Sequence, residues 1–158
     1  MRGQFILTNL QTGEEQIIPN TIVGEGAEAF FATLFNTTAL GTFYMGLCNQ
    51  VPDNSDVLLD ITTEPTIGVN GYARGVLARN GVDWPVISSQ NGETFVTSKA
   101  IVFTASGGAF DAPFTRLFIS SVATGFVGTL FSYSAALASE ITLADGVSYS
   151  AQYRMFMN

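Results

Sequence analysis

Apolar and polar residues alternate with a period of two over much of the chain, and this pattern predicts β-strands. The clearest case is the segment 148–157, in which Tyr149, Ala151 and Tyr153 alternate with polar neighbours. Further strands are predicted over residues 42–48, 72–79, 99–105, 114–120 and 126–133. The last of these is apolar on both faces, so we expect it either in the middle of a sheet or against a partner.

Turn signals separate the predicted strands at intervals of roughly 8 to 12 residues, as is typical of sandwiches and barrels. Asn70-Gly71, Asn91-Gly92 and Asp145-Gly146 favour the positive φ angles of tight turns. Asn91-Gly92 lies between two apolar runs and predicts a two-residue hairpin, although a longer loop also fits the flanking residues. We therefore expect an all-β fold, an antiparallel β-sandwich.

One segment departs from the period of two and predicts an amphipathic α-helix near residues 22–36. Its apolar residues are spaced by three and four positions, which places them on one face of a helix. They are Val23, Ala27, Phe30, Phe31, Leu34 and Phe35. We expect the helix to cover a sheet face or one end of the sandwich, with Phe30, Phe31 and Leu34 buried.

The N-terminal segment of about 1–19 is predicted to form a hairpin, because strand-like residues flank Gln11-Thr12-Gly13-Glu14. This hairpin could belong to the body of the fold or could be an arm that reaches a partner. The sequence contains no detectable linker or repeat, and its 158 residues are a usual length for one domain. We therefore expect a single β-sandwich domain over residues 1–158.

The residue types that are missing exclude several classes of function. Histidine is absent and Cys48 is the lone cysteine, so no His-based triad, His-ligated metal site or intrachain disulfide can form. We expect Cys48 to be a small buried apolar residue. We also expect the protein to bind no cofactor and to be no enzyme.

The charge of the chain argues against nucleic-acid and membrane partners. The formal net charge is −7, only 12% of the residues are charged, and the six basic residues are scattered. Phosphate backbones and anionic lipids are bound by clustered Lys and Arg, which this chain lacks. No apolar segment is long enough to span a bilayer.

Pairs of carboxylates could still perform acid–base or glycosidic chemistry without histidine. The candidates all lie in or beside predicted turns, where local hydrogen bonding accounts for them. They are Asp53, Asp56, Asp60, Glu64, Asp83, Asp111 and Asp145. The oxygens of Asp53, Asn54 and Asp56 suit Ca²⁺, but their spacing matches no calcium loop. We assign no catalytic residue and no metal ligand.

Arg74 and Trp84 are the remaining residues of interest. The glycine-rich segment 68–75 lacks the Gly-Lys-Ser/Thr of a phosphate loop and predicts a turn leading into a strand. Arg74 is predicted to pair with Glu64, as a structural ion pair or as a weak surface pair. Trp84 lies in a turn region, where it could be partly exposed or could cover an end of the sandwich. Most of the other aromatic residues fit a core, and a sugar-binding surface is the alternative.

The order of several motifs resembles a group of small structural proteins encoded by tailed bacteriophages. The most distinctive is Glu64-Pro65 followed by Gly71-Tyr72-Ala73-Arg74. The others, in chain order, are Asn20 to Gly26, Tyr44 to Leu47, Trp84, Phe103 to Gly107, Phe118-Ile119, Gly125 to Leu130 and Asp145-Gly146. The resemblance extends over residues 20–158.

The resemblance implies a jelly-roll-like sandwich in the virion, made in the host cytoplasm, with a structural motif and no catalytic residue. The motif residues are Glu64, Gly71, Tyr72, Arg74 and Trp84. Our first expectation is a head decoration (cement) protein bound to other virion proteins, above all the major capsid protein. The alternatives are a neck, tail, baseplate or fibre-associated structural or adhesion subunit and, in third place, a carbohydrate-binding module. Low charge also favours self-association, for which a trimer is expected.

Overall fold

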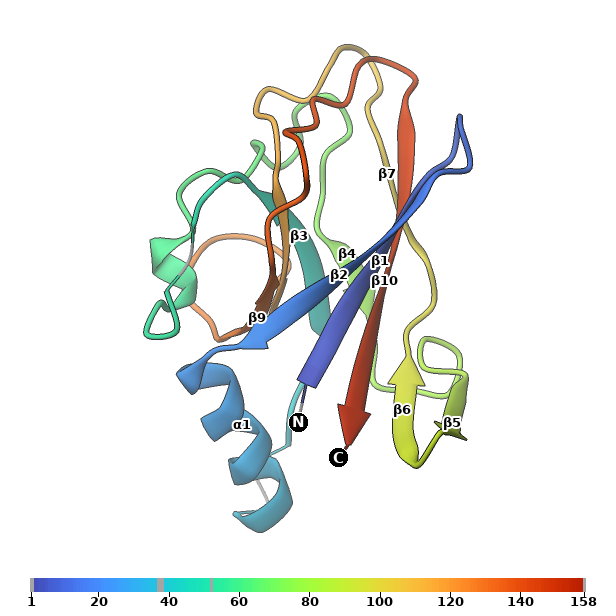
Figure 1. Cartoon of the computed structure of the whole chain (residues 1–158). Coiled ribbons are helices and arrows are strands. Elements are labelled where there is room, and N and C mark those ends of the chain that lie inside the picture. The colour runs from blue at the N-terminus through green and yellow to red at the C-terminus, as the bar shows by residue number, and fades with distance from the viewer. Residues whose placement is uncertain (1, 37–38, 52, 158) are drawn as a thin grey trace.

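The computed structural model describes residues 2–36, 39–51 and 53–157, which form one antiparallel sheet and one α-helix (Figure 1). The strands are β1 (Arg2–Asn9), β2 (Glu15–Ile22), β3 (Phe43–Cys48), β4 (Gly75–Leu77), β5 (Val86–Gln90), β6 (Glu93–Thr97), β7 (Ile101–Thr104), β8 (Arg116–Ser120), β9 (Leu130–Ser134) and β10 (Ser148–Met157). The helix is α1 (Gly24–Phe35), and η1 (Leu58–Asp60) is a short 3-10 helix. The predicted all-β antiparallel fold with one helix is confirmed.

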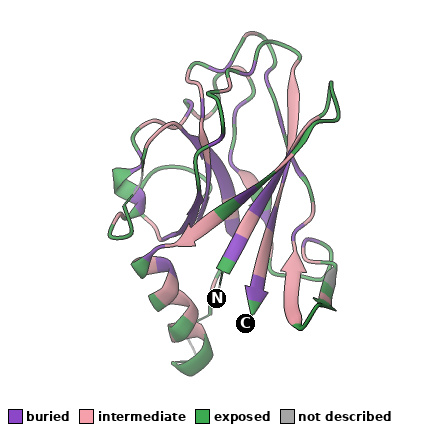
Figure 2. Ribbon diagram, viewed as in Figure 1, coloured by how far each residue is buried: buried purple, intermediate pink, exposed green. Residues whose placement is uncertain are grey.

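The sheet curls, so that its two ends face each other across the core as the layers of a sandwich do. Its strands follow the order β4-β3-β8-β9-β2-β1-β10-β6-β5, and β7 also pairs with β10. β4, at one end, contacts β7 near the other end. The approach is close: a Cβ atom on Gly75 would lie 2.1 Å from Cγ2 of Ile101. Many of the buried residues lie in the strands of the curled sheet, above all in β3, β8 and β9 (Figure 2).

The period-two patterns correctly predict several strands and their inward faces. In β7, Ile101 and Phe103 are buried while the alternate residues Val102 and Thr104 are exposed. In β3, the alternate apolar residues Phe43, Met45 and Leu47 all belong to the main core. The tight hairpin is also confirmed: β5 and β6 are joined by Asn91-Gly92, and both residues have positive φ.

Two predicted strands are shorter in the structure than in the sequence pattern. The segment 72–79 forms a strand only over Gly75–Leu77, and 126–133 becomes a strand only at Leu130. Residues 121–129 instead form a loop that is closed by the hydrogen bond from Ser121 N to Thr129 O, 3.0 Å long. The strand that follows is central as expected, because β9 lies between β8 and β2 and is buried throughout.

A second, smaller core lies apart from the main one and contains Cys48. Its residues are Val23, Cys48, Leu58, Ile61, Phe118, Leu130 and Tyr133. The prediction that Cys48 is a buried apolar residue is confirmed, since its side chain is fully buried. Burial raises the pKa of the Cys48 thiol to about 12.

We expect the Cys48 thiol to be inert in the native protein. At pH 8 it stays protonated and inaccessible, and a protonated thiol is a poor nucleophile. A chromogenic disulfide reagent should therefore label almost no thiol in buffer and one thiol per chain in denaturant. Rapid labelling under native conditions would show that the small core opens.

The N-terminal hairpin is part of the sheet and not an arm. β1 pairs with β2 on one side and with β10 on the other, and β2 continues the sheet to β9. Phe5 and Leu7 of β1 and Ile18 of β2 are core residues. The body of the fold thus depends on the hairpin for two of its central strands.

Helix α1 is confirmed, but the predicted burial of its apolar stripe is wrong. Phe30 does pack on Phe43 and Phe131, with ring centroids 6.3 and 5.8 Å away. Phe31 and Leu34, however, are 58% and 66% exposed, and Phe35 is more exposed still. No helix among the described residues is long and apolar enough to cross a bilayer.

The apolar stripe of α1 is exposed because the helix contacts the sheet mainly through its N-terminal half. A Cβ atom on Gly26 would lie 2.2 Å from the backbone oxygen of Phe131, so only glycine permits this approach. The Glu25 carboxylate accepts a hydrogen bond from Leu130 N at 2.9 Å. The helix then runs on past the end of β9 (Figure 1), and its later residues Phe31, Leu34 and Phe35 are exposed.

Truncation of Leu34 should therefore have little effect on folding. We expect Leu34→Ala to change the free energy of unfolding of the dilute protein by less than about 0.5 kcal/mol, as exposed sites do. The matched variant Leu47→Ala, at a fully buried position, should cost about 2–5 kcal/mol. Urea denaturation measures both values. A large loss for Leu34→Ala would show that the helix face is covered within the chain.

Candidate functional site

The structure brings together three of the sequence-predicted motif residues, Glu64, Tyr72 and Arg74. The Arg74 guanidinium donates to both carboxylate oxygens of Glu64, from Nε at 2.8 Å and from Nη2 at 2.6 Å. Both side chains are buried, with 0% and 3% exposure. The predicted ion pair is confirmed, and it is a buried pair and not the weak surface pair of the alternative interpretation.

Tyr72 connects this ion pair to strand β3. Its hydroxyl donates to Glu64 Oε1 at 2.7 Å and accepts a hydrogen bond from Leu47 N at 3.0 Å. Burial, together with the neighbouring Glu64 carboxylate, raises the pKa of the Tyr72 hydroxyl well above its usual value. The phenol is thus held as a neutral donor.

The remaining Arg74 donors hold the loop of residues 121–129. Nη1 donates to Val122 O at 2.9 Å, and Nη2 donates to Gly125 O at 3.0 Å. The guanidinium also lies 5.1 Å from the centroid of the Phe118 ring. Because the charged groups of this network bond to each other and to the backbone, the network is suited to fixing a loop in place and not to acid–base chemistry.

The other two motif residues lie elsewhere. Gly71 has φ 83° and follows Asn70 with φ 49°, so the predicted tight turn is confirmed. Trp84 is half-buried and packs on Phe43 and Tyr153, with ring centroids 6.0 and 6.5 Å away. It therefore belongs to the aromatic cluster on the inside of the sheet, and its half-buried side chain agrees with the interpretation that it is partly exposed.

The candidate carboxylates serve turns and ion pairs. Asp145 accepts hydrogen bonds from Gly107 N and Gly108 N, and Asp111 accepts one from Thr66 N. Asp83 pairs with Lys99, whose ammonium lies 2.9 Å away and lowers the pKa of the Asp83 carboxyl. These bonds agree with the turn chemistry expected from the sequence, because each of these carboxylates has its own backbone or lysine partner.

The calcium candidates also make local hydrogen bonds. Asp53 accepts from the backbone N and the hydroxyl of Ser55, and Asp56 accepts from Asp53 N. The backbone bond from Ser55 is the main cause that lowers the pKa of the Asp53 carboxyl. Within the described part of the chain, no group of three or more Asp, Glu or Cys side chains is placed to hold a metal ion.

A prominent surface feature is an open apolar groove of about 700 Å³ between α1 and the β5–β6 hairpin. One wall is formed by Phe31 and Leu34 of the helix, and the opposite wall by Ile87 of β5 and Val96 of β6. Met157 of β10 lies between the two walls. The sequence pattern did not predict this groove, because it assigned the helix stripe to the core.

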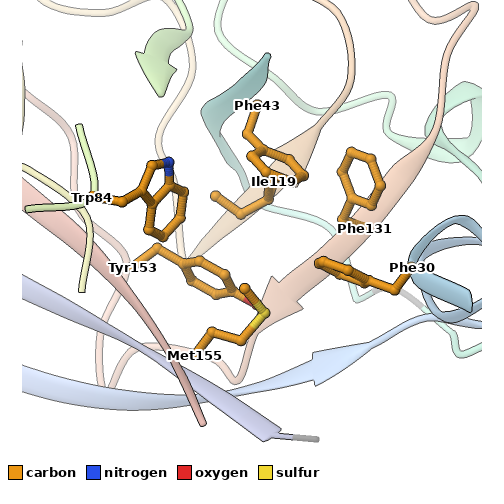
Figure 3. Close-up of a pocket in the computed structure, with 7 residues that line it drawn as sticks. All are labelled: Phe30, Phe43, Trp84, Ile119, Phe131, Tyr153 and Met155. Atoms are coloured by element: carbon orange, nitrogen blue, oxygen red, sulfur yellow. The ribbon is translucent and has the colours of Figure 1, made fainter. Parts of the chain in front are cut away.

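The inner end of the groove is a cluster of aromatic side chains that belongs to the core (Figure 3). Phe43 is at its centre, with the Phe131 ring centroid 4.9 Å away and Trp84 on the other side. Met155 and Tyr153 of β10 complete the floor. The buried Trp84 Nε1 atom has no hydrogen-bond partner among the described residues, so this indole acts here through its apolar surface.

The groove contains little polar chemistry. Arg79 is the charged residue among those that line it, and its Nη1 donates to Leu40 O at 2.6 Å. The remaining polar lining comes from Thr33 and Asn80. Such a surface can bury apolar groups of a partner but offers neither a nucleophile nor an acid–base pair.

Comparison of the chain with models of known protein families and with curated protein sequences finds no match.

Proposed function

We propose that this protein is a non-catalytic structural subunit of a tailed-bacteriophage virion, with attachment to the capsid shell as a head decoration protein as the first assignment. The observation that carries the proposal is the open apolar groove, which extends along exposed Phe31, Leu34, Ile87 and Met157. Contiguous apolar patches of this kind mark surfaces that another protein covers.

The buried network supports the phage assignment in a second way. The segment Glu64 to Arg74 carries the most distinctive part of the phage resemblance, and Glu64, Tyr72 and Arg74 interact with one another in the structure. Through Arg74, this network holds the loop 121–129. Val127 of the loop is 93% exposed. A rigid loop with an apolar tip is suited to a contact with a neighbouring subunit.

The carbohydrate-binding alternative has less support from the side chains. Sugars stack on exposed aromatic rings, and Tyr72, Tyr133 and Tyr153 are buried while Trp84 is half-buried in the aromatic cluster. The exposed rings of Phe31 and Phe35 lie on the apolar face of α1, beside a groove with few polar groups to bind sugar hydroxyls. Binding of the isolated protein to a glycan array, lost on substitution of an exposed aromatic residue, would favour that alternative instead.

The decisive experiment is to locate the chain in the particle. Particles of a phage whose genome encodes the chain should be purified and separated into heads and tails. Both fractions should be examined by mass spectrometry and cryo-electron microscopy. We expect the chain in the head fraction, with density on the outer face of the shell. Density on the neck, tail or baseplate would move the assignment there, and absence from purified particles would refute the virion proposal.

A further inference from the structure

We propose that the groove and the outer face of α1 form a two-fold interface between two copies of this chain. The outer face of α1 carries Phe31, Leu34 and Phe35, which are 58%, 66% and 76% exposed. Phe31 and Leu34 also line the groove. The convex helix face and the concave groove therefore form one continuous surface.

This shared surface favours two-fold symmetry over a ring. In a ring of three or more copies, each subunit offers two separate patches to its two neighbours. Here the projecting patch and the receiving patch share two side chains, so both cannot be used by different neighbours. A patch that binds its own equivalent is isologous and closes as a dimer. The inference therefore replaces the trimer expected from the sequence with a dimer.

The apolar area is sufficient for a specific contact. A Phe side chain presents roughly 150–250 Å², so the exposed parts of Phe31 and Phe35 offer roughly 200–300 Å² together. With Leu34, Ile87 and Met157 the patch reaches on the order of 600 Å² per copy, which approaches the roughly 800 Å² that each partner contributes to a standard interface.

The charges on the patch fit a second copy despite the acidity of the chain. Two chains of net charge −7 repel each other in general. The groove, however, is lined by the cation Arg79, and Glu28 is an exposed acid one helical turn before Phe31. Glu28 of one copy can thus approach Arg79 of the other, and the two-fold axis makes this pair twice.

The edge of the sheet beside the groove is also open to pairing with a second chain. β5 is the terminal strand in the sheet order and reads Val-Ile-Ser-Ser-Gln, without a charge or a proline. Exposed edge strands usually carry a charged residue or a proline, which prevents pairing with another chain. Ile87, which is 76% exposed, links this edge to the groove.

The inference goes beyond the proposed function, because it assigns the groove to a second copy of the chain and leaves other surfaces, such as the loop 121–129, for contacts with the virion. The test is sedimentation equilibrium of the full chain over a concentration series, with light scattering as a second measure of mass. We expect the wild-type protein to be a dimer. We expect Leu34→Asp to be a monomer by sedimentation and to be folded by circular dichroism. The matched control Leu59→Asp, at a leucine that is 65% exposed and does not line the groove, should remain a dimer.

A charge exchange tests the orientation of the two copies. Arg79→Glu should raise the dissociation constant about tenfold, which corresponds to about 1.4 kcal/mol. Adding Glu28→Arg should restore most of the affinity, because the pair is rebuilt with its signs reversed. A loss without any restoration would show that the helix does not lie over the groove as proposed.

Three results would overturn the proposed dimer interface. They are a wild-type chain that stays monomeric at its highest soluble concentration, a Leu34→Asp variant that still dimerises, and a trimer that depends on Leu34. Failure of the dimer is distinguishable from failure of the proposed function. A monomer that still enters virions refutes the interface alone, whereas a dimer that is absent from virions refutes the function alone.

Discussion

Deletion of residues 1–18 is expected to abolish the folded state. The deletion removes β1 and the first half of β2, and it leaves β10 and the rest of β2 without the central strand that pairs with both of them. It also removes the core residues Phe5, Leu7 and Ile18. The loss of several buried side chains, each worth about 2–5 kcal/mol, exceeds the whole stability of an ordinary domain. Circular dichroism and urea denaturation would show an unfolded or insoluble chain.

A pair of point substitutions gives the matched control for the deletion. Leu7 of β1 is 1% exposed, whereas Leu10, at the end of the same hairpin, is 49% exposed. We expect Leu7→Asp to prevent folding and Leu10→Asp to be tolerated. A chain of residues 19–158 that keeps a cooperative unfolding transition would contradict the structure and would restore the interpretation of the hairpin as an arm.

Removal of either partner of the Glu64–Arg74 pair is expected to destabilise the fold by about 3–5 kcal/mol, because the charge that remains is buried without its counter-ion. Glu64→Gln leaves the guanidinium without a carboxylate, and Arg74→Met removes the donors to Val122 O and Gly125 O as well. The double variant should cost less than the sum of the two single variants. Urea denaturation of all four proteins measures this coupling.

The exposed pair Arg2–Glu93 is the matched control. Its N–O distance of 2.5 Å is as short as that of the buried pair, but the side chains are 49% and 34% exposed. Surface pairs contribute about 0–1 kcal/mol, so Arg2→Met should have a small effect. Equal effects of Arg2→Met and Arg74→Met would show that burial of the Arg74 pair does not matter to stability.

The parts of the fold that sequence patterns predicted are those governed by neighbouring residues. The alternation of Ile101 and Phe103 with Val102 and Thr104 sets which face of β7 is buried. The positive φ preference of Asn91-Gly92 sets the β5–β6 hairpin. The spacing of three and four residues likewise predicted α1, because helical geometry places those residues on one face.

The parts that could not be predicted depend on residues distant in the sequence. The stripe of α1 was assigned to the core because nothing near it shows where the sheet ends, whereas its position is set by Gly26 against Phe131. Arg74 was paired with the nearby Glu64, but its bonds to Val122 and Gly125, 48 and 51 positions away, were not foreseen. These bonds attach the loop 121–129 to Arg74, and the exposed residues Phe31 and Leu34 of α1 line the groove.

The pairing of β1 with β10 has a consequence for the timing of folding. Asn9 and Tyr149, which pair at the end of this ladder, are 140 positions apart, and β1 and β10 lie side by side in Figure 1. β10 also pairs with β6 and β7, so β1, β6 and β7 all lack a partner strand until β10 has been synthesised. Loop closure over such distances is slow, and folding in the range of milliseconds to seconds is typical of such topologies. On the ribosome, the central hairpin must therefore remain without one of its neighbours until residues 148–157 have been synthesised and have left the exit tunnel.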